Sequence, residues 1–293
     1  MTAATDRTAG GHLAVAVPAT ADAAALAPTA PTIRLRSRLA SWTTRAAVLV
    51  GTALVWQLLT THHVAASWIR FDTLPSVTAV AAEFGRALGT RTYYLDLVQS
   101  LIRIGTGFAV AAALGIPAGI ALGRSAWAQR TLGTLFELAR PVPAIALVPI
   151  VILMFPSSEA GMVAITAVAA FFPIVVSVRH SVRALPTVWE ESVRTLGGGR
   201  AAVISRVVLP GALPGIFSGL SVGIGVSWIC LVSAEMISGR LGVGYRTWQA
   251  YTVIDYPGVF VGIITIGVLG FATSALIERI GRRATRWLPR GER

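Results

Sequence analysis

The chain has 293 residues, of which 54% are hydrophobic and only 13% are charged, about half the charged share of an ordinary soluble domain. The mean hydropathy is +0.69, and the apolar residues gather in blocks long enough to cross a hydrocarbon core about 30 Å thick. This composition excludes a soluble globular enzyme. It predicts an all-α, polytopic membrane protein.

Lysine is absent, so all 25 basic residues are arginines, and 13 acidic residues leave a formal net charge of +12. A Walker A loop needs a lysine to hold the phosphates of ATP. If this protein acts in an ATP-driven process, the ATPase must therefore be another chain. The single cysteine, Cys230, and four histidines, of which only His62 and His63 are neighbours, predict neither a disulfide framework nor a metal site.

In chain order, residues 1–45 are predicted to form a disordered cytoplasmic tail, because the first thirty are rich in Ala, Thr and Pro. A signal peptide is the competing interpretation, but Pro18 and Asp22 interrupt its short apolar stretch. A transmembrane domain is expected at 46–277, with six spans at about 46–61, 97–122, 133–155, 160–178, 213–237 and 258–277. A basic cytoplasmic tail is expected at 278–293.

The distribution of arginine indicates the orientation of the chain. Six spans put both termini on one side, and the segments on that side hold 18 arginines against five on the other side. By the positive-inside rule, both termini are expected in the cytoplasm. Topology therefore accounts for the basic charge better than nucleic-acid binding, which needs a folded basic soluble domain.

Residues 186–210, between the fourth and fifth spans, form the most informative segment. Pro186 suits the start of a helix, Glu190 and Arg194 are spaced i,i+4, and a run of three glycines begins at Gly197. A second short helix is expected over 200–208, ended by Leu209-Pro210 before the fifth span. On composition alone, an ordinary basic loop with local helix is the simpler interpretation.

This segment resembles the EAA loop of permease subunits in type I bacterial ABC importers. That loop reads Glu-Ala-Ala, three residues, Gly, nine residues, then Ile-x-Leu-Pro. Glu191, Gly197 and Leu209-Pro210 keep every spacing, although both alanines and the isoleucine are replaced. The resemblance implies the type I permease fold and a coupling loop that sits in a groove of the ATPase subunit. The residues it assigns to coupling are Glu190, Glu191, Arg194, Gly197, Leu209 and Pro210.

Over residues 74–287 the chain looks most like permeases for nitrate, taurine and aliphatic sulfonates, a branch that also contains thiamine-precursor importers. One departure is Met154-Phe155-Pro156-Ser157-Ser158, where the family usually has Trp-Phe-Gly-Ile-Gly. The closer likeness rests on Leu74-Pro75-Ser76, Ser100-Leu101-Ile102-Arg103, Gly107-Phe108, Gly115-Ile116-Pro117, Arg140-Pro141-Val142-Pro143, Phe171-Phe172-Pro173-Ile174, Arg194-Thr195-Leu196-Gly197, Ala234-Glu235-Met236 and Gly242-Val243-Gly244-Tyr245.

The resemblance implies a permease of the bacterial inner membrane that performs no covalent chemistry and imports a small anion such as a sulfonate, taurine or nitrate. Its implied partners are a second permease copy in a homodimer, an extracytoplasmic binding protein, and two cytoplasmic ATPase subunits that bind ATP and Mg²⁺. Two alternatives stay open. One is ABC import of a thiamine-precursor-like or other small organic solute, and the other is an ion-coupled secondary transporter, which needs no ATPase.

Charged residues at membrane depth are costly and are therefore functional candidates. Arg103 is expected near a membrane interface, where it can snorkel. Arg140 forms either a local ion pair with Glu137 or part of an anion pathway. Glu235 is expected to pair with an arginine from another span or to belong to an outer gate. The candidate pathway residues are Arg103, Arg140, Phe172, Ser221, Trp228 and Glu235.

Small residues recur every four positions in the fifth span, a pattern that lets helices approach closely. The row is expected to pack within the subunit or at a dimer axis, and it consists of Gly211, Gly215, Gly219 and Gly223. Residues 219–223 also match the G-x-S-x-G motif of hydrolases. That motif needs a strand-to-helix turn and a histidine base, which this helical position does not offer, so a membrane serine protease is disfavoured.

Overall fold

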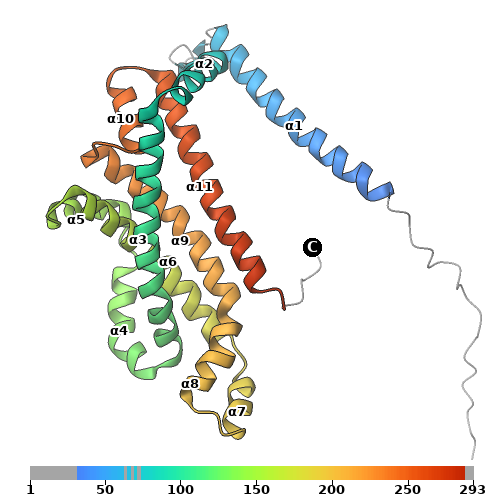
Figure 1. Ribbon diagram of the computed structural model, residues 1–293, viewed down its shortest axis with the longest axis vertical. Coiled ribbons are helices and arrows are strands. Elements are labelled where there is room, and N and C mark those ends of the chain that lie inside the picture. The colour runs from blue at the N-terminus through green and yellow to red at the C-terminus, as the bar shows by residue number, and fades with distance from the viewer. Residues whose placement is uncertain (1–31, 63–64, 67–68, 71–73, 288–293) are drawn as a thin grey trace, which may run out of the picture. The chain divides into compact units, whose positions relative to one another are not determined.

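The computed structural model describes residues 32–62, 65–66, 69–70 and 74–287 of the chain. Within these ranges the protein is almost entirely helical (Figure 1), which confirms the all-α fold class. The first elements are α1 (Thr32–Thr61), a two-residue antiparallel pair β1 (Ala65–Ala66) and β2 (Ile69–Arg70), α2 (Val77–Leu88), α3 (Arg91–Arg124) and α4 (Ala126–Ala139). They are followed by η1 (Ala144–Leu147), α5 (Val148–Met154), α6 (Ser158–Arg183), α7 (Thr187–Thr195), α8 (Arg200–Val203), η2 (Ile204–Val208), α9 (Leu209–Ser238), α10 (Val243–Thr252) and α11 (Tyr256–Ala284).

The chain divides into two units at Val55. In the first unit, α1 begins at Thr32, so the predicted disordered tail at 1–45 is wrong for residues 32–45; residues 1–31 lie outside the described ranges. Residues 32–45 contain neither proline nor glycine, and they include good helix formers such as Leu, Arg and Ala. The basic C-terminal segment, predicted as a cytoplasmic tail at 278–293, begins within α11, which continues to Ala284.

Four helical stretches of the described chain are long and apolar enough to cross a membrane: α3, α6, the continuous stretch Arg200–Ser238, and α11. The pair Ala126–Ala139 and Ala144–Met154 makes a fifth if it is counted as one span. Residues Ala46–Thr61, predicted as the first span, form a shorter apolar stretch of α1.

The predicted third span at 133–155 is not one straight helix. It bends by 83° between α4 and η1. Pro141 and Pro143 lie in the break, and neither can donate a helical hydrogen bond; each also disfavours the helical conformation in the residue before it. We call residues 140–143 the break.

The expected stop at Leu209-Pro210 is also wrong, because α8, η2 and α9 form one continuous helical stretch. Just before the proline, η2 widens to a π-type turn, and the Leu209 N–H donates to the Ile204 carbonyl five residues back. Proline normally clashes with the carbonyl four residues earlier. The wider turn relieves that clash, so the helix passes through Pro210 without ending.

The core is built around α6, which packs against α3 on one side and α9 on the other. Ile174, Val178 and Val182 on α6 are fully buried. Glycines of both neighbours bring the backbones close: a Cβ added at Gly119 of α3 would lie 2.6 Å from Cβ of Val178, and one at Gly219 of α9 would lie 2.7 Å from Cβ of Ser177. The whole row in α9, namely Gly211, Gly215, Gly219 and Gly223, faces α6 or the residue that follows its end.

Candidate functional site

The segment with the coupling motif lies at the end of the second unit where α7 and α8 project, opposite the end that carries α2 and α10 (Figure 1). Helix α7 ends in a tight turn at Gly197, whose φ of 81° belongs to the left-handed region. The Gly198 N–H then donates to the Val193 carbonyl over 2.9 Å. Only glycine adopts this conformation without strain, so the turn explains why glycine stands at position 197.

The two neighbouring glutamates of α7 have different surroundings. Glu190 forms an ion pair with Arg124 at the end of α3, and its side chain is only 12% exposed. Arg194 lies 3.9 Å from the other carboxylate oxygen of Glu190, whereas Glu191 is exposed. Glu190 therefore attaches α7 to α3, while Glu191 and Arg194, the two residues predicted to make polar contacts, are exposed.

An apolar surface on and beside α7 was not identified from the sequence. Val188, Trp189 and Leu196 are 56%, 49% and 88% exposed. Together with Glu191 they form what we call the α7 face. The available signal was the presence of large apolar residues in a short, otherwise polar helix outside the membrane spans.

A buried polar cluster lies at the other end of the unit. Arg103 of α3 is 1% exposed, and its Nη1 donates to Oε1 of Glu235 over 2.8 Å and to the Leu241 carbonyl over 2.6 Å. Its Nε donates to Oε2 of Glu159 over 2.8 Å, and its Nη2 also pairs with that carboxylate. The expected snorkelling of Arg103 is therefore wrong, because two carboxylates and a carbonyl compensate the loss of hydration.

The same cluster satisfies the first backbone N–H groups of α10. The Gly242 N–H donates to Asp96 over 2.9 Å, the Val243 N–H to Ser100 over 3.0 Å, and the Gly244 N–H to Glu235 over 2.9 Å. Such N–H groups have no partner within the helix, and negative charge is favourable beside them. Sequence reasoning missed Asp96, Ser100 and Glu159, although Asp96, Ser100 and Arg103 share one helical face at intervals of four and three.

Two of the expected pathway residues, Glu235 and Trp228, are buried within the subunit and contact other helices. Glu235 is 0% exposed and pairs with an arginine from another helix, as the sequence analysis expected. Trp228 is 4% exposed, and its Nε1 donates to Thr273 of α11 over 3.0 Å. Neither side chain, nor that of Arg103, reaches a surface of the subunit.

Arg140 and Phe172, by contrast, line a hollow of about 360 Å³ between the break, α6 and α9. Ser221 does not line it, although the adjacent Val222 does. We call this hollow the Arg140 pocket. Its lining residues are Arg140, Val142, Ala144, Ala169, Phe172, Pro173, Val176, Ser177, Val222 and Val226.

Charge around the Arg140 pocket is unbalanced. Oε1 of Glu137 accepts a hydrogen bond from Nη1 of Arg179 over 2.5 Å, while Nη1 of Arg140 is 3.7 Å from the other oxygen of that carboxylate. The expected Glu137–Arg140 pair thus exists, but Arg179 is the closer partner. An arginine at membrane depth costs about 2.5–3.5 kcal/mol on insertion scales, and Arg140, whose side chain is 53% exposed, receives little compensation from the protein.

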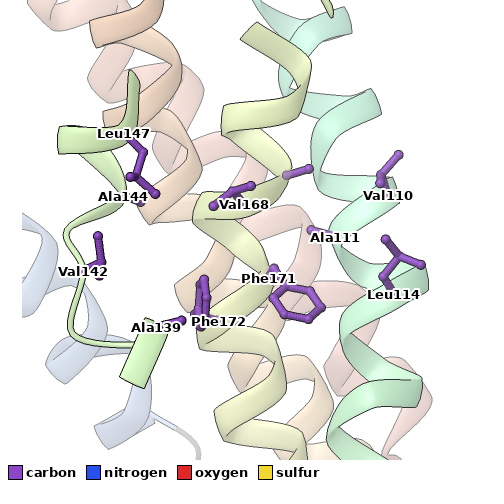
Figure 2. A pocket seen from close by; sticks show the side chains of 11 residues that line it. Val110, Ala111, Leu114, Ala139, Val142, Ala144, Leu147, Val168, Phe171 and Phe172 are labelled. Atoms are coloured by element: carbon purple, nitrogen blue, oxygen red, sulfur yellow. The ribbon is translucent and has the colours of Figure 1, made fainter. Parts of the chain in front are cut away.

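A second, purely apolar hollow of about 470 Å³ lies on the other side of Phe172. Figure 2 shows its side chains projecting from α3, from α6 and from the bent segment at 139–147. Within the described residues, no group of three His, Cys, Asp or Glu side chains could hold a metal ion.

Residues 114–286 match the family described as "Binding-protein-dependent transport system inner membrane component". The nitrate import permease protein NrtB of Leptolyngbya laminosa is 32% identical over 80% of this chain and 84% of its own length. The taurine transport system permease protein TauC of Escherichia coli is 35% identical over 67% and 71%. The bicarbonate transport system permease protein CmpB of Synechococcus elongatus is 32% identical over 67% and 70%.

Among solved structures, a chain of the MetNI methionine ABC transporter in an inward-facing conformation superposes with a TM-score of 0.54 at 20% identity. The match covers 69% of this chain and all of that chain, and it shows a shared fold. The family match covers more than half of this sequence, and the relatives agree with it. The chain belongs to the inner membrane components of binding-protein-dependent transport systems, and it is a permease subunit of an ABC importer.

Proposed function

We propose that this permease imports a small anion and is driven by a separate ATPase that docks on the α7 face. The docking proposal rests on the different surroundings of the side chains of α7. Glu190 attaches the helix to Arg124 of α3, while Val188, Trp189, Leu196 and Glu191 are directed to solvent. A short helix with exposed apolar residues suits insertion into a groove of a partner.

The proposed assembly contains two copies of this chain, two ATPase subunits that hold ATP and Mg²⁺, and an extracytoplasmic binding protein. Both termini and α7 lie on the cytoplasmic side. Movement of the ATPases would reach α3 through the Arg124–Glu190 pair and α9 through the continuous Arg200–Ser238 stretch. Gly197 shapes the turn, and Leu209-Pro210 lies within the helical connection to α9. Arg194, beside Glu190, is exposed at the edge of this contact.

Co-purification with the ATPase tests the docking proposal. Trp189→Ala combined with Leu196→Ala removes two large apolar contacts, so we expect the permease to lose most of the co-purifying ATPase. Trp248→Ala is the matched control, because Trp248 is 41% exposed and lies on α10 at the opposite end. Normal ATPase recovery with the double variant, or ATP-independent uptake by the permease alone, would contradict the proposal.

The anion proposal is supported by relatives whose names specify nitrate, taurine and bicarbonate transport. Nitrate, the sulfonate group of taurine and bicarbonate are all anionic near neutral pH. The test is to measure which solute the cognate binding protein retains, by calorimetry with nitrate, taurine and bicarbonate. Retention of a neutral pyrimidine or a cation in their place would overturn the anion assignment and leave the docking proposal standing.

A further inference from the structure

The Arg140 pocket lies where one helix is interrupted inside the bundle. The α6 residues that line it run from Ala169 to Ser177. At a rise of about 1.5 Å per residue, they lie about 9–21 Å from the end of the helix at Arg183. The pocket is therefore well inside the length of α6. Irregular backbone at membrane depth is tolerated only where it is buried in protein or lines a water-filled cavity. Residues 140–143 are exposed in the single subunit, and the break borders this pocket through Arg140 and Val142, so the pocket is where water can reach the unpaired backbone groups.

The charges next to the pocket leave one positive charge unmatched. Arg140, Arg179 and Glu137 are neighbours, and two guanidinium groups share one carboxylate. Arg179 has the short contact of 2.5 Å and a side chain only 15% exposed, whereas Arg140 is 3.7 Å from Glu137 and lines the pocket. Among the described residues, no carboxylate is closer to Arg140 than that of Glu137, at 3.7 Å. N–H donors of Arg140 therefore remain available to an anion in the pocket.

A guanidinium group has the chemistry to select small oxyanions. It carries a permanent charge and a planar set of five N–H donors, which can bind two oxygens of a nitrate, sulfonate or carboxylate at once. Ser177 adds a hydroxyl to the lining, and the rest of the wall is apolar. The volume of about 360 Å³ equals that of about twelve water molecules at about 30 Å³ each. A small anion therefore fits together with part of its hydration shell.

The second hollow, shown in Figure 2, offers no such chemistry. It shares Val142, Ala144 and Phe172 with the Arg140 pocket, but no charged residue lines it. The two hollows thus lie on either side of Phe172, and only one of them carries a charge. The charged part of the wall is therefore on the side of α6 that faces α9.

We propose that the Arg140 pocket is an intramembrane binding site for small oxyanions, at which Arg140 selects the anion during import. This rests on the proposed function, which it deepens by adding a selective site within the permease itself, separate from that of the binding protein.

The test uses the complete importer, with ATPase and binding protein, in proteoliposomes supplied with labelled nitrate, taurine or bicarbonate. At saturating loaded binding protein, we expect Arg140→Gln to lower the import rate about tenfold or more, the usual loss when a hydrogen bond to a charged group is removed. Arg140→Lys keeps the charge and should retain most of the rate. Arg130→Gln is the matched control, because Arg130 is an exposed arginine of α4, the helix that precedes Arg140, and does not line the pocket. Wild-type import by Arg140→Gln would overturn the proposal.

A second variant keeps the proposal testable if Arg140→Gln fails to assemble. Val222→Trp leaves every charge in place but fills the pocket from α9, so it should also block import. Ile263→Trp, at an exposed site on α11, is its control. Import at the wild-type rate by Val222→Trp would count against a site in this pocket.

Calorimetry separates this inference from the proposed function. Nitrate titrated into the permease–ATPase complex without binding protein should bind saturably to wild type and to Arg130→Gln, and not to Arg140→Gln. This result would support the site even if the binding protein retained a neutral solute. If nitrate does not bind while phosphatidylglycerol binds in an Arg140-dependent manner, Arg140 is a lipid headgroup site and the proposal is wrong.

Discussion

At the scale of single residues, Arg103 shows how a charge can be a core residue of a membrane protein. It is 1% exposed, and its partners Glu159 and Glu235 belong to α6 and α9. Removing one partner of a buried pair costs about 3–5 kcal/mol, and without Glu235 the buried Arg103 keeps only one carboxylate partner, Glu159, whose side chain is 55% exposed. The ion pair therefore joins α3 to two other helices, and its loss should be measurable as a loss of stability.

We expect Glu235→Leu to lower the unfolding temperature in detergent by about 6 °C or more, from about 3 kcal/mol of destabilisation in a chain of this size. The double variant Arg103→Met/Glu235→Leu should recover part of that loss, because it removes the buried guanidinium group that Glu159 alone would otherwise compensate. Cys230 is the single cysteine of the chain and is buried, so a thiol-reactive dye reports unfolding directly.

The control for this prediction is Glu278→Leu on α11. Glu278 pairs with Arg282, and both side chains are more than half exposed. Exposed ion pairs contribute little to stability, so no measurable shift is expected. An equal shift in Glu235→Leu and Glu278→Leu would show that the Arg103 pair does not hold the helices together.

At the scale of elements, the close packing of α6 predicts opposite effects for two glycines of α3. A Cβ at Gly119 would lie 2.8 Å from Cγ1 of Val178 and 3.0 Å from the Val175 carbonyl oxygen, whereas one at Gly105 would meet nothing within 4 Å. Gly119→Ala should therefore lose about 1–3 kcal/mol through overpacking. Gly105→Ala should gain about 0.5–1 kcal/mol from reduced backbone entropy of the unfolded chain.

The same dye measurement in detergent checks this pair of variants. We expect the unfolding temperature to fall for Gly119→Ala and to stay level or rise for Gly105→Ala. A rise for both would mean that helix propensity alone decides, and that α3 and α6 can separate at no cost.

Hydropathy was sufficient to predict helices over most of α3, α6, α9 and α11, because their apolar blocks are continuous. It could not predict the break, since mean hydropathy has no information on direction and α4, η1 and α5 are apolar on both sides of Pro141 and Pro143. Pro210 had the opposite effect: it predicted the end of a helix, whereas the wide turn of η2 just before it lets the helix continue through the proline. Local sequence patterns were therefore least reliable at prolines, which interrupt the helix at residues 140–143 and do not interrupt it at Pro210.

The candidate sites also differ in how far they could be predicted from the sequence. The coupling segment was recognisable because its motif is contiguous in the chain. The polar cluster was not, because Arg103 meets Glu159 and Glu235 across 56 and 132 residues. Without the fold, Arg103 resembled an interfacial residue. Its intervals to Asp96 and Ser100 were the one local sign that this face of α3 is polar and buried.

At the scale of the whole molecule, orientation has a direct test. Leu196 is 88% exposed at the α7 end and Val253 is 72% exposed after α10. In a Cys230→Ala background, a membrane-impermeant thiol reagent applied to intact cells should label Val253→Cys and leave Leu196→Cys unlabelled. Inverted vesicles should give the reverse result, because the arginine-rich segments are expected in the cytoplasm. Labelling of Leu196→Cys from outside would invert the proposed topology.

The position of α6 between two rows of glycine also restricts how this subunit can move. Backbones in such close contact cannot slide past one another without collision, because valine and isoleucine side chains of α6 lie opposite the glycines of α3, and serine side chains of α6 lie opposite Gly215 and Gly219 of α9. Helices α3, α6 and α9 therefore form a single mechanical block. A gate in such a transporter cannot open by sliding one of these three helices within a subunit. Conformational change in this subunit would instead take place along the outer surfaces of the block.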